Sequence, residues 1–166
     1  MKILLAAFLM PVTLWALGPE NPTPITGPTT ERNVSLDMAL AAAQAAVADC
    51  TAKGYLVSAT VVDASGVVKA TVRGDGAAPH TPNASRRKAY TSASGRNSTS
   101  AMLATSQSNP AAQNLGEIDE FLLLGGGLPI RSGTEVIGAI GVSGAPGGPL
   151  DEQCAQVGLD KIKESL

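Results

Sequence analysis

The stretch Phe121–Gly148, FLLLGGGLPIRSGTEVIGAIGVSGAPGG, decides the fold of this chain. Its apolar runs are interrupted by three consecutive glycines and then by a Ser132-Gly133 turn. Apolar runs bounded by turn residues are typical of short strands. The pattern predicts three strands and a closing loop: Phe121–Leu124, a short strand around Pro129 and Ile130, Glu135–Ser143, and the Gly/Pro loop Gly144–Gly148.

The loop Gly144–Gly148 is a candidate ligand site. We expect Asp151 to be the N-cap of a terminal helix behind it. A helix N-terminus presents free N–H groups and a partial positive charge, so the loop and helix would form a cradle for a carboxylate or another anion. The alternative is that these glycines only shape tight turns and a close strand–helix join.

Composition limits the class of protein. The chain has 166 residues, of which 44% are hydrophobic and only 3% aromatic, so a single domain must build its core from Ala, Val, Leu and Ile. The formal net charge is -2, without a basic stripe or an acidic tail. Nothing in this balance points to nucleic acid or to a cationic partner.

The N-terminal residues predict export. Lys2 precedes an apolar run, and we interpret residues 1–17 as a secretory signal peptide. An uncleaved anchor is the alternative, but the run is short for a spanning helix, and we expect no membrane span in the mature protein. Residues 18–33 form a Pro-rich linker, and residues 34–166 the domain. The predicted location is periplasmic or secreted.

The remaining elements follow from periodicity and turn residues. Ser35 would cap a helix that runs to Lys53, and Gly54 would end it. Its predicted inner stripe is Leu36, Leu40, Ala43, Val47 and Cys50. The other predicted elements are strands Tyr55–Val62 and Val67–Arg73, helices Ala84–Ser94 and Ser100–Thr105, a polar loop at Gln107–Ile118, and a helix from Glu152 to Ser165 with the stripe Leu150, Cys154, Val157 and Ile162. This order predicts an α/β domain with one antiparallel sheet of about five strands and helices packed on it.

The two cysteines are a candidate disulfide. Cys50 lies near the end of the first helix and Cys154 near the start of the last, each on an apolar stripe. If those helices pack antiparallel on one face of the sheet, these ends meet, and an oxidising compartment would permit the bond. Two buried, reduced cysteines remain the alternative.

His80 and a group of cationic residues are the other candidates. A lone histidine can be an axial haem ligand or a general base, or it can be an ordinary loop residue. Arg73, Arg86, Arg87 and Lys88 would form a cationic rim around the same loop, suited to carboxylates such as haem propionates. The alternative is a solvated helix face.

Several catalytic motifs are absent or incomplete. Gly141–Ala145, GVSGA, resembles a nucleophile elbow but lacks its last glycine, and the only histidine precedes the serine. The sequence has no Walker loop, no HExxH and no CxxCH. No catalytic residue is therefore assigned, and a binding protein is favoured over an enzyme.

Six segments of the chain resemble a known family. In order they are GYLVSATVVDASG (54–66), RGDGA (73–77), KAYT (88–91), GGGLPI (125–130), VIGAIGVSGAPGG (136–148) and DEQCA (151–155). This pattern is similar to that of the GlcG/HbpS-like family, also called the haem-degrading or DUF336 family. The resemblance implies a profilin-like α-β-α sandwich that assembles into homodimers or octamers.

The resemblance also implies a function. Characterised relatives bind haem, and in one branch a threonine after the KA-aromatic-T motif approaches the iron; Thr99 is the matching position here. The acidic E-x-x-E motif of that branch is missing, so binding of free iron is not carried over.

We therefore expect an exported haem-binding protein that takes up haem reversibly in an oligomeric pocket. Thr99 or His80 would be the iron ligand, and Arg73, Arg86 and Arg87 would surround the propionates. The alternative is a periplasmic accessory or sensor protein that binds a small organic acid at Gly144–Gly148.

Overall fold

The computed structural model describes residues 27–166, so the predicted signal peptide and most of the linker lie outside the described residues. Residues Glu31–Leu166 form one compact unit. Its helices and strands are α1 (Leu36–Ala52), β1 (Ser58–Asp63), β2 (Val68–Arg73), α2 (Thr81–Gly95), α3 (Thr99–Ser108), β3 (Gly127–Ser132), β4 (Glu135–Ser143) and α4 (Gly148–Ile162). Three short 3₁₀ turns complete it: η1 (Pro110–Ala112), η2 (Leu115–Glu117) and η3 (Lys163–Ser165).

The sheet is antiparallel throughout, with the strand order β2-β1-β4-β3. The fold class is the predicted one, but residues 27–166 contain four strands where about five were expected. The missing strand is Phe121–Leu124. Its backbone groups bond to helix side chains instead: the Leu122 N–H donates to Thr91 Oγ1, and the Leu124 carbonyl accepts from Thr99, each at 2.8 Å.

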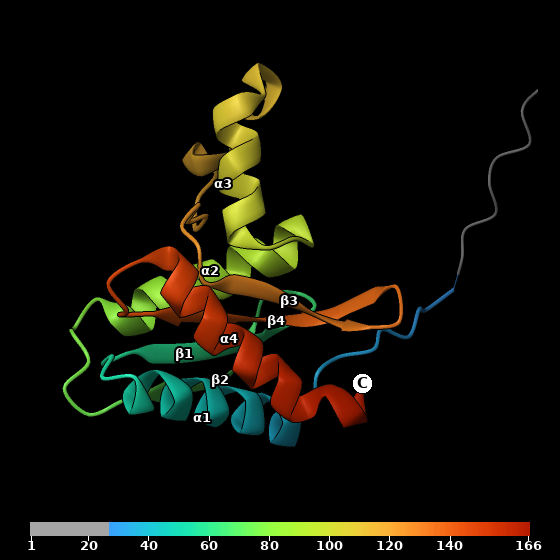
Figure 1. The fold of residues 1–166 in the computed structure, drawn as a ribbon. Helices are drawn as coiled ribbons and strands as arrows, with labels where there is room; N and C mark the ends of the chain where they lie inside the picture. Colours follow the sequence, from blue (N-terminus) through green and yellow to red (C-terminus); the bar gives the residue numbers. More distant parts are fainter. Residues whose placement is uncertain (1–26) are drawn as a thin grey trace, which may run out of the picture. The chain divides into compact units, whose positions relative to one another are not determined.

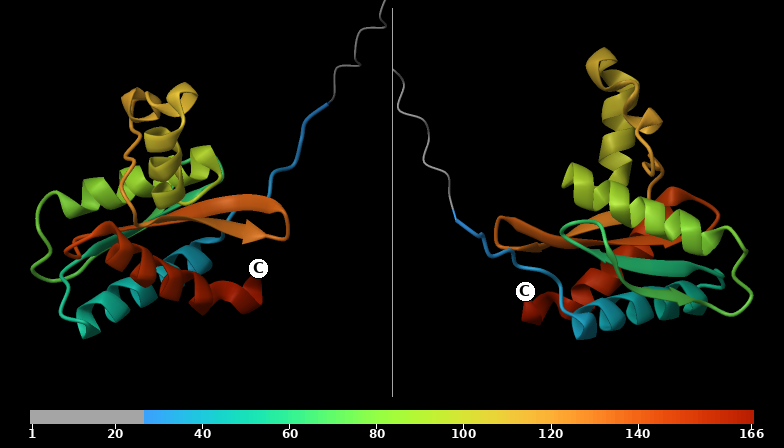
Figure 2. Two further views of the ribbon diagram at one scale, coloured as in Figure 1. Left: turned by 45° about the horizontal axis from the view of Figure 1, so that its top comes forward. Right: turned by 180° about the vertical axis from the view of Figure 1, so that it is seen from behind.

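The sheet lies between two helical layers, α1 with α4 on one face and α2 on the other (Figure 1). Ser35 caps α1 by accepting a hydrogen bond from the Met38 N–H, and Gly54 follows the helix at a φ of +83°, both as predicted. Two further views show α3 standing away from the sheet (Figure 2). This helix is longer than predicted and is capped by Ser98, and part of the expected Gln107–Ile118 loop is helical.

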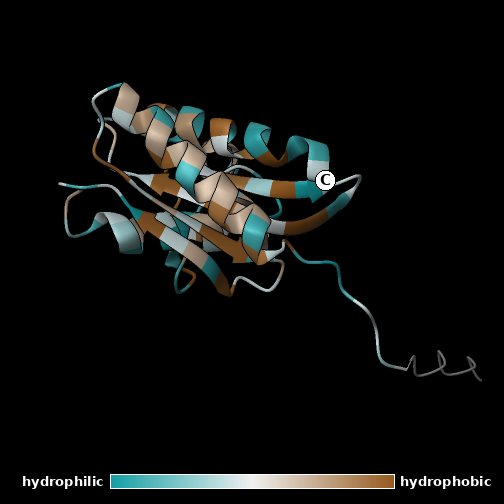
Figure 3. Cartoon of the chain, turned by 90° about the horizontal axis from the view of Figure 1, so that it is seen from below, coloured by the Kyte–Doolittle hydropathy of each residue, from teal (hydrophilic) through white to brown (hydrophobic). Residues whose placement is uncertain are grey.

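The face that α1 and α4 cover is apolar (Figure 3). The predicted stripes were wrong in part, because Leu36 is 55% exposed, Leu40 38% and Val157 37%. Small residues take the inner positions, since an added Cβ at Gly158 of α4 would lie 2.6 Å from the Ala42 carbonyl oxygen of α1. The buried side of α1 consists of Ala39, Ala42, Ala43, Ala46 and Cys50.

A disulfide closes this layer. It joins Cys50, at the end of α1, to Cys154, near the start of α4, with the Cα atoms 5.6 Å apart. The helix ends meet in the arrangement that the disulfide hypothesis required. The bond therefore fixes the first turns of α4 against the rest of the domain.

The opposite face is built from hydroxyl groups and small residues. Thr60 of β1 pairs with Ser85 of α2 at 2.8 Å, and Ser58 pairs with Thr81 at 2.8 Å. Gly141 of β4 permits close approach, because an added Cβ would lie 2.1 Å from the Ser85 carbonyl oxygen. As a result α2 is buried through residues whose hydropathy resembles that of a surface helix.

None of the helices in residues 27–166 is both long enough and apolar enough to cross a membrane.

Candidate functional site

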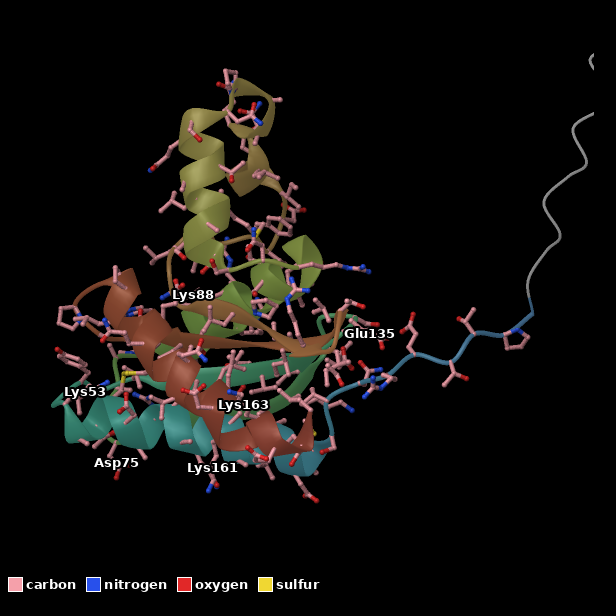
Figure 4. All side chains as sticks on the ribbon, turned by 45° about the vertical axis from the view of Figure 1, so that its right-hand side comes forward. Lys53, Asp75, Lys88, Glu135, Lys161 and Lys163 are labelled. Atoms are coloured by element: carbon pink, nitrogen blue, oxygen red, sulfur yellow. A yellow bond between two sulfur atoms is a disulfide. The ribbon has the colours of Figure 1, made fainter. Side chains whose placement is uncertain are left out.

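Lys88 and Asp151 form an ion pair inside the protein. Lys88 Nζ donates to Asp151 Oδ2 at 2.7 Å and to the Val142 carbonyl oxygen at 2.9 Å. The two side chains are 0% and 4% exposed. Figure 4 shows Lys88 between α2 and the sheet, whereas Lys161 and Lys163 lie near the end of α4. The predicted cationic rim is therefore wrong for Lys88, which links α2 to β4 and α4.

Burial governs the protonation of this pair. It lowers the pKa of Lys88 from its ordinary value, and the Asp151 carboxylate offsets part of that effect. Burial likewise raises the pKa of Asp151, against the influence of the Lys88 ammonium and of backbone N–H donors. Desolvation is the largest cause of the pKa shift for both groups. Burial of the pair therefore costs hydration free energy, which the packing of the surrounding elements must offset.

The predicted anion cradle is filled by the chain itself. Asp151 is not the N-cap of α4, because the helix begins at Gly148 and its N-cap is Gly147. Asp151 instead accepts a hydrogen bond from the Ala145 N–H at 2.9 Å through Oδ1. The carboxylate that this Gly-rich loop binds is thus the one that also pairs with Lys88.

The three candidate arginines bond to the chain's own carbonyl and carboxylate groups. Arg73 donates to the Ala77 carbonyl oxygen, 3.1 Å from Nε. Arg86 pairs with Glu120, and Arg87 donates to the carbonyl oxygens of Glu120 and Phe121. These contacts hold two loops, one after β2 and one before β3. The structure does not bring the three guanidinium groups into a single pocket.

The two candidate iron ligands occupy different places. His80 is exposed and precedes the first residue of α2. Thr99 is fully buried, and its Oγ1 donates to the Leu124 carbonyl oxygen at 2.8 Å and accepts from the Gly127 N–H at 2.9 Å. Ligation by Thr99 would require the hydroxyl to release the bonds that fix α3 to the start of β3. Residues 27–166 contain no cluster of His, Cys, Asp or Glu that would hold a free metal ion.

The residue after Thr99 opens onto a pocket of about 360 Å³. It lies at the β3 edge of the sheet, between the start of α3 and the first turns of α4. This volume is within the range of small-molecule sites. The lining residues are Ser100, Leu128, Pro149, Glu152, Gln153 and Gln156.

Glu152 is the charged residue of this pocket. Its Oε1 accepts a hydrogen bond from Ser100 Oγ at 3.0 Å. Its Oε2 is buried, and it has no hydrogen-bond partner among the residues that the structure describes. Sequence reasoning missed this residue, because DEQCA was used only to place the start of a helix and to support the family resemblance. Glu152 lies within α4 between the buried Asp151 and the exposed Gln153, and its residue type alone does not distinguish it from an ordinary surface glutamate.

The family of the chain follows from comparison with known proteins. The family profile described as "Haem degrading protein HbpS-like" matches residues 34–160. This chain belongs to the HbpS-like family. The resemblance noted from the six sequence segments is thereby confirmed. No curated protein matches the chain.

Solved structures agree with this assignment. A Streptomyces reticuli HbpS variant with two Glu→Asp substitutions is 37% identical, with a TM-score of 0.76 over 84% of this chain and 95% of that one. The Klebsiella pneumoniae protein ORFY, of the DUF336 family, is 26% identical, with a TM-score of 0.79 over 85% and 98%. A PduOC:haem complex, 22% identical over 78% and 95% with a TM-score of 0.70, shares the fold.

Proposed function

We propose that this chain binds haem reversibly at the pocket between α3 and α4. Membership of a haem-degrading family supports haem as the ligand class, and a protein of the same fold has been crystallised with haem. The observation that carries the proposal is the pocket itself, which begins at the residue next to Thr99.

The pocket suits one part of a haem molecule better than another. Leu128 and Pro149 offer an apolar surface for a porphyrin face, and Ser100 and Glu152 contribute polar oxygen atoms to the lining. No Arg or Lys lines the pocket, so its residues do not neutralise propionates. We infer that the ring enters with its propionates directed outward. Bound haem would supply a redox-active iron, and the protein's own residues would hold it by shape and weak oxygen contacts.

In this proposal Thr99 does not bind the iron, and its role is to hold the residues that line the pocket in position. Its two hydrogen bonds fix the start of α3, and with it Ser100, against β3. His80 remains a second candidate ligand only for haem bound at the other end of α2. Eight residues, or about 12 Å of helix, separate it from Lys88 in the middle of α2.

We further propose that the protein is exported and works as a homodimer or a larger oligomer. The apolar N-terminal run and the disulfide favour an oxidising compartment. Exposed Leu36, Leu40 and Val157 on the α1 and α4 layer favour contact with a second copy. Light scattering of the mature protein with and without haemin would measure the assembly.

A haemin titration followed by the Soret band tests haem binding. We expect a saturable, shifted band at a fixed stoichiometry per chain. Gln153→Trp should weaken binding by roughly tenfold or more, because the indole ring would occupy the pocket that exposed Gln153 lines.

The matched control is Gln113→Trp, which places the same ring on an exposed position outside the pocket. Its affinity should equal that of the wild type. A spectrum that is only the sum of free haemin and protein would reject the proposed function. Equal affinity of the two Trp variants would reject this pocket, and loss of binding in His80→Ala alone would move the site to the start of α2.

A further inference from the structure

A second pocket lies where four segments meet: the chain before α1, the β1–β2 turn, the end of α2 and the start of β4. Its volume is about 220 Å³, and none of its residues lines the pocket between α3 and α4. Sites for drug-sized ligands have volumes of about 300–1,000 Å³, so this one suits a smaller molecule. The charged residues that line it are two arginines and two glutamates: Arg32, Arg96, Glu31 and Glu135.

Arg96 is the arginine of this pocket whose side chain has no partner in the protein. Each of the other arginines in residues 27–166 donates a side-chain hydrogen bond to an oxygen atom of the chain. The Arg96 guanidinium donates none to these residues and takes part in none of their salt bridges. Its planar set of N–H donors matches a carboxylate, which can accept two of them at once.

The backbone of Arg96 is a second, independent observation. Arg96 ends α2 with a φ of 51°, in the left-handed region where glycine is the usual residue after a helix. Glu120, with a φ of 71°, is the other non-glycine residue of 27–166 in that region, and its side chain pairs with Arg86. Arg96 has no such contact within these residues. A ligand of the guanidinium would explain why an arginine occupies this position.

Hydrogen bonds between the segments hold the walls of the pocket in place. Asn33 Oδ1 accepts from the Ala64 N–H at 2.8 Å, which fixes the chain before α1 on the β1–β2 turn. Arg131 of β3 donates to the carbonyl oxygen of Arg96, which fixes the end of α2 on the sheet. Figure 4 shows Glu135 at the end of the β3–β4 hairpin, beside the segment before α1. Binding would therefore cost little ordering of the protein.

The charges of the pocket are balanced, and most of them are available to a ligand. Arg32 Nη1 and Glu135 Oε2 are 3.9 Å apart, and their side chains are 62% and 47% exposed, so this pair is weak. Glu31 forms no salt bridge within residues 27–166. A simple anion would bring its charge close to two carboxylates. A molecule that carries both a carboxylate and an ammonium group matches both signs of charge.

We infer that this pocket binds a free α-amino acid with a small side chain. Arg96 binds the carboxylate, and Glu31 and Glu135 bind the ammonium group. Ala93 and Val136 provide an apolar wall for the side chain. The site is separate from the pocket proposed for haem, so the inference adds a second ligand to that function and does not depend on it.

The experiment compares three small molecules that differ in their charged groups. L-Alanine, propionate and ethylamine are titrated into isotope-labelled mature protein, and binding is followed by the NMR shifts of its amide groups, which also report weak binding. We expect saturable shifts with L-alanine at the pocket residues, and affinities for the other two that are roughly tenfold lower or less, because each lacks one charged contact. No saturable shifts with L-alanine would overturn the inference. Equal affinity for propionate would also overturn it, because the ammonium group would then not be recognised.

Two variants test the roles of the charged residues. Arg96→Gly should lower L-alanine affinity roughly tenfold or more, because it removes the guanidinium. Lys163→Gln is the control, since it removes one positive charge from an exposed position outside the pocket, and its affinity should equal that of the wild type. Glu31→Gln should weaken binding of L-alanine and strengthen binding of propionate, because it removes a negative charge. L-Alanine affinity unchanged in Arg96→Gly, or both ligands weakened alike by Glu31→Gln, would contradict the assignment.

Thermal unfolding without ligand separates a binding role of Arg96 from a structural one. Glycine adopts a φ of 51° more readily than arginine does, and Arg96→Gly keeps the carbonyl oxygen that accepts from Arg131. This variant should therefore melt close to the wild-type temperature or above it, and its affinity for haemin should be unchanged. A melting temperature several degrees lower, or a parallel loss of haemin binding, would assign Arg96 to the structure and overturn the inference.

Discussion

The two faces of the sheet are stabilised by different chemistry. The face under α1 and α4 is apolar and contains the disulfide, with buried alanines where the helices approach each other. The face under α2 is lined by paired hydroxyls and by the ion pair of Lys88 and Asp151, and its apolar cluster has only Val62, Ala89, Ala93 and Ala139. A helix can therefore be buried by hydrogen bonding and small size as effectively as by hydrophobic stripes.

This difference affects how each face responds to substitution. Removal of an alkyl group from the apolar face leaves a cavity, whereas removal of one polar partner from the other face leaves a buried group without its hydrogen bond. We expect the polar face to be the more sensitive to single changes and the more tolerant of paired ones.

Lys88→Met should have the largest effect. It leaves the Asp151 carboxylate buried without its counter-ion, and loss of one member of a buried pair costs about 3–5 kcal/mol of unfolding free energy. The double variant Lys88→Met/Asp151→Leu should recover most of this loss. Equilibrium unfolding in urea measures both, and a double variant no better than the single one would contradict the desolvation argument.

The pH dependence of the same pair has a defined sign. Burial lowers the pKa of Lys88 below 10.5, so the unfolded chain holds this proton where the folded chain releases it, and folded stability rises as pH approaches 10.5. Burial raises the pKa of Asp151 above 3.8. The stability contributed by the protonated Asp151 is therefore fully present below pH 3.8 and is lost as the pH rises through the pKa of the folded state. The unfolding free energy of wild type minus that of the double variant should thus pass through a minimum between these limits. A maximum near neutral pH would show that the ion pair is net stabilising.

Loss of the disulfide should have the next largest effect, on the apolar face. Cys50 and Cys154 are 104 residues apart, and bonds that close long loops typically contribute about 2–4 kcal/mol. Cys50→Ala/Cys154→Ala should unfold at a lower urea concentration. The wild type in reductant is the control, and it should match the double variant if the bond accounts for the whole difference.

Gly141→Ala tests the close approach of α2. The added Cβ would lie 2.1 Å from the Ser85 carbonyl oxygen, so the helix must shift, and overpacking of this kind costs about 1–3 kcal/mol. Gly116→Ala is the matched control, because its nearest neighbour would be Leu123 Cδ1 at 3.8 Å. Equal stability of the two variants would mean that α2 can move outward freely.

The hydroxyl pair between β1 and α2 should show the smallest effect. Ser85→Ala removes one partner of Thr60 at 2.8 Å and should cost about 1 kcal/mol. Thr60 retains Thr71 at 3.1 Å, which limits the loss. A double-mutant cycle with Thr60→Val measures the coupling energy between the two hydroxyls. A coupling energy of zero would show that their hydrogen bond does not stabilise this face.

The sequence predicted those elements whose signals are local. Ser35 and Gly54 marked the ends of α1, and the Ser132-Gly133 turn marked the join of β3 and β4. Strand β4 was predicted at its observed bounds, Glu135–Ser143. Cap and turn signals depend on a few adjacent residues, so they can be recognised in a single sequence.

The polar interior was not predictable in this way. Arg86, Arg87 and Lys88 are consecutive cations, and hydropathy treats them alike, yet Lys88 is fully buried while Arg86 and Arg87 bind the segment before β3. The place of each residue on the helix decides which of the three cations is buried. The position of Lys88 permits burial because Asp151, 63 residues later in the chain, lies opposite it. The same holds for Glu152, whose neighbour Ser100 is 52 residues away.

By itself the sequence determined the antiparallel α/β class, most element positions, the pairing candidates Cys50 and Cys154, and the family, because each depends on local patterns or on motifs in order. Only the tertiary structure decided which faces are buried, that Thr99 is committed to Leu124 and Gly127, and that Ser100 and Glu152 share a pocket. Those features depend on contacts between distant segments, where small residues and buried charges are chosen by their neighbours rather than by their own hydropathy.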